Sequence, residues 1–196
     1  LSYYEWSAMA RPRSDAAGPD ACERIVEAFW EMLSEMPYPE MKVTALARKA
    51  HVSPNTLYYH FDGILDVARH ALVGTMDAGL AQAMAAADAE TIVSFVATNR
   101  KRSERVAAFA RSGSAELTGM LADALRAHWL SSTGVSEDDL DDASRRDLAF
   151  VIGGIVAVLG DASVDQSPES VAAFFNRPLG RGAAEMMNGL ATLRAS

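Results

Sequence analysis

The chain has 196 residues, of which 49% are hydrophobic and 22% are charged, and its formal net charge is −8. This composition is typical of a folded globular protein, and the negative total argues against a general polyanion binder. The single Cys22 excludes an internal disulfide, and no apolar run reaches the roughly 18 residues of a membrane span, so we expect a cytoplasmic protein.

The N-terminal segment, residues 1–14, lacks the basic start and apolar core of a signal peptide. The natural chain could start at Leu1 or at Met9, and the sequence does not favour either. With a start at Met9, the first eight residues would not belong to the natural chain.

A first helix is predicted from Asp20, because apolar residues recur there at spacings of three and four. Glutamates recur every four residues on its other side, and we expect this side to be well hydrated and unable to lie against phosphates. The segment "MPYPE" ends this helix, since two prolines two residues apart cannot continue it. The glutamates are Glu23, Glu27, Glu31 and Glu35.

Two short helices follow, the first over residues 43–50 and the second from Ser53 to His60 or Phe61. Ser53 is a good N-cap, and Pro54 suits the first helical position because its missing N–H costs nothing there. Next comes a long helix from Ile64 to about residue 86.

Further helices are predicted near residues 90–99, 102–110, 114–130, 138–159 and 168–193, with a break near Pro178 left open in the last. Ser136 is expected to cap the fourth of these, with acidic residues in its first turn. No strand pattern or repeat occurs. The sequence therefore predicts an all-α protein with a small N-terminal unit of three helices and about 60 residues, followed by a larger helical bundle.

The two short helices are separated by a turn of three or four residues, which is the arrangement of a helix-turn-helix. Small Ala47 permits a close helix crossing, and Val52 and Leu57 fill the space between the helices. The remaining side chains of the second helix project elsewhere, where amides, hydroxyls and tyrosines can bond base edges and phosphates. They belong to Asn55, Thr56, Tyr58 and Tyr59.

The segment "VTALARKAHVSPNTLYYHF", preceded by "RIVEAFWEMLSE" and "MPY", resembles the DNA-binding domain of the TetR family of bacterial transcriptional regulators over about residues 21–72. The resemblance implies a homodimer that binds a palindromic double-stranded DNA operator without a cofactor, more often as a repressor that a small-molecule effector releases. It also implies a flexible arm over 1–19, a helix-turn-helix domain over 20–66, and a C-terminal effector-binding and dimerisation domain over 67–196.

Carried over by position, the resemblance gives a set of DNA contacts. The base-reading residues are Pro54, Asn55, Thr56 and Tyr58. Tyr59 and His60 are expected at the DNA backbone, Thr44 and Lys49 near phosphates, and Ser53 at a helix end that favours phosphate. Core packing of one tyrosine, and a His60 that only holds the helix end, stay open as alternatives.

Three positions depart from the family pattern. His51 stands where the turn usually has glycine, and Lys42 stands where Ser or Thr usually caps the helix. Asp62 and Ile64 follow the "YYHF" run where lysine commonly binds phosphate. We therefore expect a weak phosphate contact, unless Asp62 caps the next helix, with Arg11 and Arg13 compensating from the arm through a minor groove.

The larger domain offers candidates for two further sites. A hydrophobic or amphipathic effector would contact Phe95, Asn99, Phe109, Met120, Trp129 and Phe150, with Met84 nearby, although such a set at helical spacing equally suits a plain core. The segments "DLAFVIGGIVAVLG" and "SPESVAAFF" resemble the last two helices of many family members, which implies a dimer interface. Its candidates are Phe150, Gly153, Gly154, Val171, Phe174 and Phe175.

The basic run at residues 99–105 has three interpretations: it could bind an anionic effector, extend the contact with DNA, or form the solvated start of a helix. We favour the solvated helix start.

Other classes of function have weaker support. The four histidines and Cys22 show no metal-binding spacing, and no nucleophile elbow, phosphate loop or dinucleotide motif occurs, so we predict neither an enzyme nor a metal site. The alternative is a helical protein–protein interaction module whose helix-turn-helix no longer binds DNA.

Overall fold

The computed structural model describes residues 20–76 and 89–191, and within these residues it contains α-helices and short 3-10 helices but no strand. The prediction of an all-α protein with a helix-turn-helix at its N-terminus is confirmed. The helices are α1 (Ala21–Glu35), α2 (Val43–Lys49), α3 (Pro54–His60), α4 (Ile64–Thr75), α6 (Ala89–Thr98), α7 (Arg100–Ala110), α8 (Ala115–Thr133), α9 (Asp142–Gly160), α10 (Pro168–Phe175) and α11 (Pro178–Ala191). The 3-10 helices are Tyr38–Glu40 and Glu137–Asp139.

Helix α4 is shorter than predicted. It ends at Thr75 and Met76 is extended, so the prediction that the helix continues through Met76 to about residue 86 was wrong at Met76. Residues 77–88, with Met84, lie outside the described residues. Val73, Gly74 and Thr75 are weak helix formers. The Thr75 hydroxyl also donates to the Ala71 carbonyl at 3.0 Å, a bond that disturbs the helical ladder.

Two later helices begin or break differently from the prediction. Ser136 caps the 3-10 helix at Glu137–Asp139, whereas α9 begins three residues later with Asp141 as its N-cap. The helix expected over 168–193 is broken, because Pro178 starts α11 after α10 has ended at Phe175.

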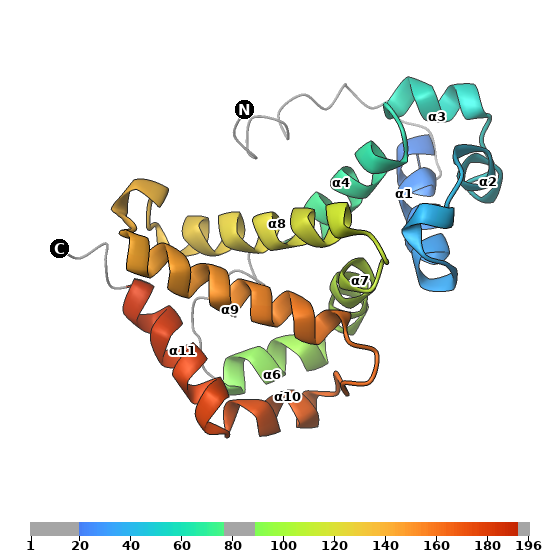
Figure 1. Cartoon of the computed structure of the whole chain (residues 1–196). Helices are drawn as coiled ribbons and strands as arrows, with labels where there is room; N and C mark the ends of the chain where they lie inside the picture. The colour runs from blue at the N-terminus through green and yellow to red at the C-terminus, as the bar shows by residue number, and fades with distance from the viewer. Residues whose placement is uncertain (1–19, 77–88, 192–196) are drawn as a thin grey trace.

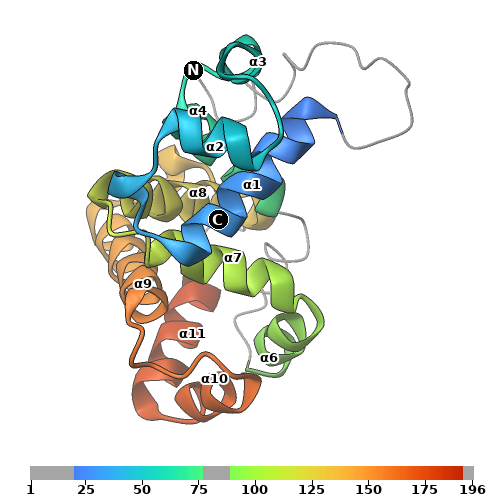
Figure 2. The same cartoon turned by 90° about the vertical axis from the view of Figure 1, so that its right-hand side faces the viewer.

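The helix-turn-helix lies at one end of the molecule, where α2 and α3 pack on α1 (Figure 1). The long helices α8 and α9 run side by side, and α6, α10 and α11 lie at the opposite end from α3 (Figures 1 and 2). Helix α7 contacts α1 on one side and α8 and α9 on the other. It therefore lies between the N-terminal helices and the rest of the molecule.

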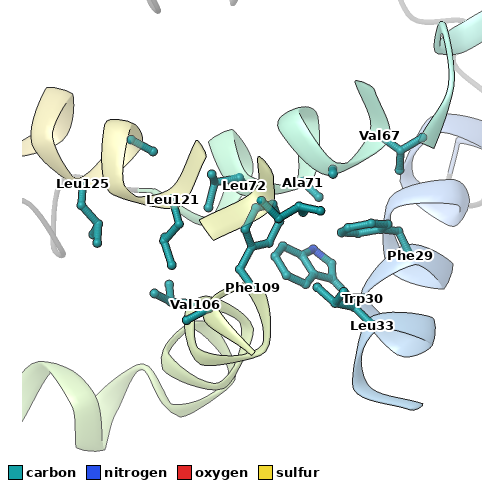
Figure 3. Packing of buried hydrophobic residues seen from close by; sticks show 14 of the residues in the cluster. Phe29, Trp30, Leu33, Val67, Ala71, Leu72, Val106, Phe109, Leu121 and Leu125 are labelled. Atoms are coloured by element: carbon teal, nitrogen blue, oxygen red, sulfur yellow. The ribbon is translucent and has the colours of Figure 1, made fainter. Parts of the chain in front are cut away.

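One continuous apolar core runs through both parts of the chain. Helix α1 contributes Phe29, Trp30 and Leu33, which face residues of α4, α7 and α8 (Figure 3). Phe109 of α7 packs against two of these rings, with centroid distances of 6.3 Å to Phe29 and 5.7 Å to Trp30. The N-terminal unit thus shares its core with the larger bundle through α1 and α4.

The glutamates on the outer side of α1 are ion-paired rather than only hydrated, which corrects the prediction for this side. Lys49 of α2 contacts Glu31 and Glu35, with Nζ–O distances of 3.3 and 2.9 Å. Glu27 contacts Lys101 at 2.8 Å and also Arg105, both on α7. Helix α1 is therefore tied to α2 and to α7 by charge as well as by apolar contact.

The turn between α2 and α3 requires a left-handed residue, and His51 supplies it with φ of 54°. The amide of Val52 donates to the Ala47 carbonyl at 3.0 Å and closes this turn. His51 therefore adopts the left-handed conformation that glycine usually supplies at this turn.

We predict that His51→Gly stabilises the protein by about 0.5–1 kcal/mol, because glycine adopts this φ without the steric cost of a Cβ. Urea unfolding followed by circular dichroism measures the change. His51→Ala is the matched control: it removes the imidazole but keeps the Cβ, and we expect no stabilisation. An equal gain in both variants would show that the imidazole, not the backbone, carries the strain.

Candidate nucleic-acid interface

The start of α3 is held by two hydroxyls. Ser53 Oγ accepts a hydrogen bond from the Thr56 amide at 3.0 Å and lies 2.8 Å from Thr56 Oγ1. Pro54 occupies the first turn, as predicted. Thr56 is half-buried and its hydroxyl is hydrogen-bonded to Ser53, so this side chain stabilises the first turn of α3.

The inner side of α3 is buried and fixes how the helix is presented. Leu57 and Phe61 lie in the core with Leu46 and Ala47 of α2, and Val52 of the turn packs against it. With these positions turned inward, the opposite side of this seven-residue helix is left to solvent.

The outer face of α3 consists of Pro54, Asn55, Tyr58 and Tyr59, which are all exposed. Tyr58 is 56% exposed and Tyr59 is 69% exposed, so the alternative that one of them packs in the core is excluded. His60 is half-buried, and the centroid of its ring lies 5.1 Å from that of Tyr59 and 6.4 Å from that of Phe61. An amide and two phenols presented side by side suit hydrogen bonds to base edges and phosphates.

The two cationic residues of α2, Arg48 and Lys49, have different surroundings. Lys49 is held by Glu31 and Glu35, and the hydrogen bond to Glu35 raises the pKa of the Lys49 ammonium group. Arg48 is exposed, and none of the ion pairs found within residues 20–76 and 89–191 involves it. Thr44 is exposed and lies four residues before Arg48, so both share one side of α2.

Sequence reasoning named Lys49 and not Arg48 as the residue near phosphate. The contacts of Lys49 with Glu31 and Glu35 join two helices, and residue spacing along the chain does not give them.

The departures from the family pattern have distinct structural outcomes. Lys42 begins α2 without a side-chain cap, and Gly63, not Asp62, is the N-cap of α4, so the suggestion that Asp62 caps this helix was wrong. Asp66 instead accepts a hydrogen bond from the Asp62 amide at 3.2 Å, which leaves the exposed Asp62 carboxylate beside the end of α3. Ile64 packs against the core.

The six effector candidates are not brought together. Phe109 and Trp129 are fully buried, Phe109 in the aromatic cluster with α1, whereas Phe150 is 69% exposed on α9. Phe95 and Met120 are half-buried, and the Asn99 side chain donates to the Phe95 carbonyl at 3.1 Å. The indole N–H of Trp129 is buried without a hydrogen-bond partner among the described residues.

The dimer candidates divide between two helices. Phe150, Gly153 and Gly154 are exposed on α9 and continue as a stripe through Ala157 and Val158. Helix α10 packs against α6, which leaves Val171 and Phe175 half-buried and Phe174 38% exposed.

The basic run at 99–105 begins α7, and two of its cations, Lys101 and Arg105, contact Glu27 of α1. A third, Arg100, pairs with Glu104 on its own helix. A solvated helix start therefore describes only part of this run, because its charges also join α7 to α1.

Arg11 and Arg13 lie outside the described residues. Within the described residues no cluster of three or more metal-binding side chains occurs, and no helix is long and apolar enough to cross a membrane.

Comparison with known proteins agrees with this geometry. Residues 25–71 match the family described as bacterial regulatory proteins, tetR family, and this match spans α1 to α4. Searches of the curated proteins and of the solved structures returned no significant match. The N-terminal domain of the chain is therefore a helix-turn-helix DNA-binding domain of the tetR type.

Proposed function

We propose that the protein is a homodimeric repressor that binds a two-fold symmetric DNA operator through the outer face of α3 and is released by a small-molecule effector. The observation that carries the DNA contact is this face itself: Asn55, Tyr58 and Tyr59 are exposed on a helix whose opposite side is buried. In a helix-turn-helix the second helix enters the major groove while the first crosses the backbone.

Within this proposal, Thr44, Arg48 and the Ser53-capped start of α3 contact phosphates, with His60 and Tyr59 at the DNA backbone. Lys49 supports the site by holding α2 against α1. Asp62 weakens the phosphate contact, and Arg11 and Arg13 of the arm over residues 1–19 offset it in a minor groove. The exposed Asp62 carboxylate also favours the alternative, an interaction module that no longer binds DNA.

For the homodimer, we propose that the α9 stripe meets its copy. Phe150 is among the most exposed large apolar residues described, and solvent exposure of such a side chain beside small residues marks an association surface. A Cβ added at Gly153 or Gly154 would meet nothing within 4 Å in the chain itself, so the α9 backbone is accessible to a partner helix. On α10, the exposed Phe174 is the further candidate for this interface, and Val171 and Phe175 beside it are half-buried.

For the effector, we propose a site in the domain over residues 67–196, with the domain over 20–66 as the DNA reader, in a cytoplasmic protein. Trp129 offers a buried N–H donor that has no partner in the described part of the chain, and Met120 and Phe95 offer half-buried apolar surface. A largely apolar molecule with one hydrogen-bond acceptor suits this combination. Effector and operator would then oppose each other through a coupling free energy.

Tyr58→Ala should weaken operator binding by about 10- to 100-fold, the cost of losing roughly 1–3 kcal/mol of base contact. Fluorescence anisotropy with an operator selected from random DNA measures the affinity. Leu179→Ala, which truncates a 66% exposed apolar side chain on α11, is the control and should bind as the unmodified protein does. Full affinity in Tyr58→Ala would contradict the placement of the reading face, and no retention of the unmodified protein on DNA at low salt would favour the interaction module.

Arg48→Ala should lower the slope of log affinity against log salt by about one, since one phosphate contact is lost. Lys49→Ala should leave that slope unchanged and instead lower the melting temperature, because its ammonium group is engaged by two carboxylates of α1. Titrations at four salt concentrations, paired with thermal unfolding, separate the two effects. The reverse pattern would return the phosphate contact to Lys49.

Phe150→Glu should convert the dimer to a monomer at micromolar concentration, because a carboxylate replaces the apolar side chain at the proposed interface. Sedimentation velocity gives the oligomeric state. Leu179→Glu makes the same change at a similarly exposed residue, 66% against 69%, and should stay dimeric. A monomeric unmodified protein, or a dimeric Phe150→Glu variant, would rule out this interface.

A further inference from the structure

Two cations of α7 converge on one carboxylate of α1. Lys101 Nζ donates to Glu27 Oε1 at 2.8 Å, and Arg105 Nη2 donates to Glu27 Oε2. The hydrogen bond from Lys101, followed by that from Arg105, lowers the pKa of Glu27 despite partial burial, so this group is ionised at neutral pH. Arg105 is the less exposed of the two cations, at 22%, and its guanidinium group lies 5.2 Å from the centre of the Trp30 ring.

Beneath this ion cluster, α1 and α7 meet through aromatic rings. Phe29 and Trp30 of α1 pack against Phe109 of α7, as the close-up in Figure 3 shows. Apolar contact is non-directional and tolerates small rotations of one helix over another. A charge-assisted hydrogen bond is directional, so the Glu27 cluster adds an angular restraint that the rings alone do not supply.

A second directional contact joins the segment just after the C-terminal end of α1 to the turn after α7. The Tyr38 amide, just after α1, donates to the Ser112 carbonyl in the turn after α7 at 2.8 Å. Glu27 is eight residues before the end of α1, a distance of about 12 Å along a helix. Two directional contacts this far apart therefore restrict the rotation of α1 over α7 more than the apolar packing alone does.

We propose that Glu27 is a positioning residue that fixes the angle between the helix-turn-helix and the larger bundle through Lys101 and Arg105, without touching DNA. Helices α2 and α3 pack on α1, so the direction of α1 is also the direction in which the outer face of α3 is presented. The consequence for DNA rests on the proposed function: in a dimer, this angle sets the separation of the two α3 helices, which must match half-sites about 34 Å apart.

The neighbouring glutamates provide a matched control. Glu31 lies one turn further along α1 and pairs with Lys49 of α2, within the N-terminal helices. Its side chain is 57% exposed against 47% for Glu27, so both replacements by glutamine remove one surface charge from the same helix. Only Glu27→Gln releases an ion pair that crosses from α1 to α7.

The direct test measures the angle without DNA. Spin labels are placed on cysteines at Asn55 of α3 and Asp123 of α8, both exposed, in the full chain with Cys22→Ser, and labelled chains are diluted with unlabelled ones. We expect a narrow label-to-label distance distribution in the otherwise unmodified protein and in Glu31→Gln, and one about twice as wide in Glu27→Gln, because surface charge substitutions leave the fold intact. Equal widths in both glutamine variants would overturn the proposal.

Charge reversal separates a specific pair from a general loss of charge. Glu27→Lys should broaden the distribution, and adding Lys101→Glu should narrow it again, since the pair is rebuilt with opposite signs. A distribution that stays broad in the double variant, with melting temperatures equal to the unmodified protein, would also count against a positioning role.

The DNA test uses a selected operator and versions of it with one base pair inserted or removed between the half-sites. The unmodified protein and Glu31→Gln should bind the original spacing about tenfold more tightly than the altered ones, whereas Glu27→Gln should discriminate by only about twofold. Absence of DNA binding by the unmodified protein would remove the proposed function, and the label distances would still decide the role of Glu27. Full discrimination by Glu27→Gln would overturn the inference and leave the proposed function intact.

Discussion

The arrangement of this protein depends on α1, which is covered on several sides at once. Its apolar residues enter the core shared with α4, α7 and α8, while its glutamates pair with α2 on one side and α7 on the other. Burial of rings such as Phe29 and Trp30 supplies most of the free energy of this association, because each large apolar side chain contributes on the order of 2 kcal/mol when removed from water. The ion pairs are partly exposed, so each adds at most about 1 kcal/mol of stability, but their hydrogen bonds also restrict how the helices are oriented.

The proposed reading surface, which is the outer face of α3, depends on the same packing. Helix α3 has about two turns and one buried side. Leu57 and Phe61 lie on that side, where they pack in the apolar core with residues of α1 and α2. Asn55, Tyr58 and Tyr59 are exposed as a geometric consequence of this burial. The cap formed by Ser53 and the left-handed His51 set where the helix begins, so these two residues determine the register of the side chains on its outer face.

The local features were predictable from the sequence because a short segment determines them. A cap, a proline at the first turn and a period of 3.6 residues identify α3 and its buried side without knowledge of the rest of the fold. The left-handed turn at His51 was predictable for the same reason.

Features that depend on how distant helices cross were not predictable. Lys49 and Arg48 are adjacent and chemically similar in sequence, and only the position of Glu31 and Glu35 across the α1–α2 contact distinguishes them. Phe109 and Phe150 are both phenylalanines on amphipathic helices, yet one is buried against α1 and the other is exposed on α9. The end of α4 was missed because the alanine-rich pattern continues past Gly74 and Thr75, whose weak helix propensity is a smaller signal than periodicity.

The scarcity of unengaged cations near α3 explains why the direction of α1 matters in the proposed complex with DNA. The net charge is −8, and near α3 Lys49 is already engaged by carboxylates while Asp62 adds a negative group. An interface with few unengaged cations gains little from phosphate attraction, so its affinity rests on base contacts that fail when displaced by about an ångström. A complex formed in this way would be sensitive to the angle of α1, and Lys101 and Arg105, which a stronger electrostatic contact would use, are instead paired with Glu27 of that helix.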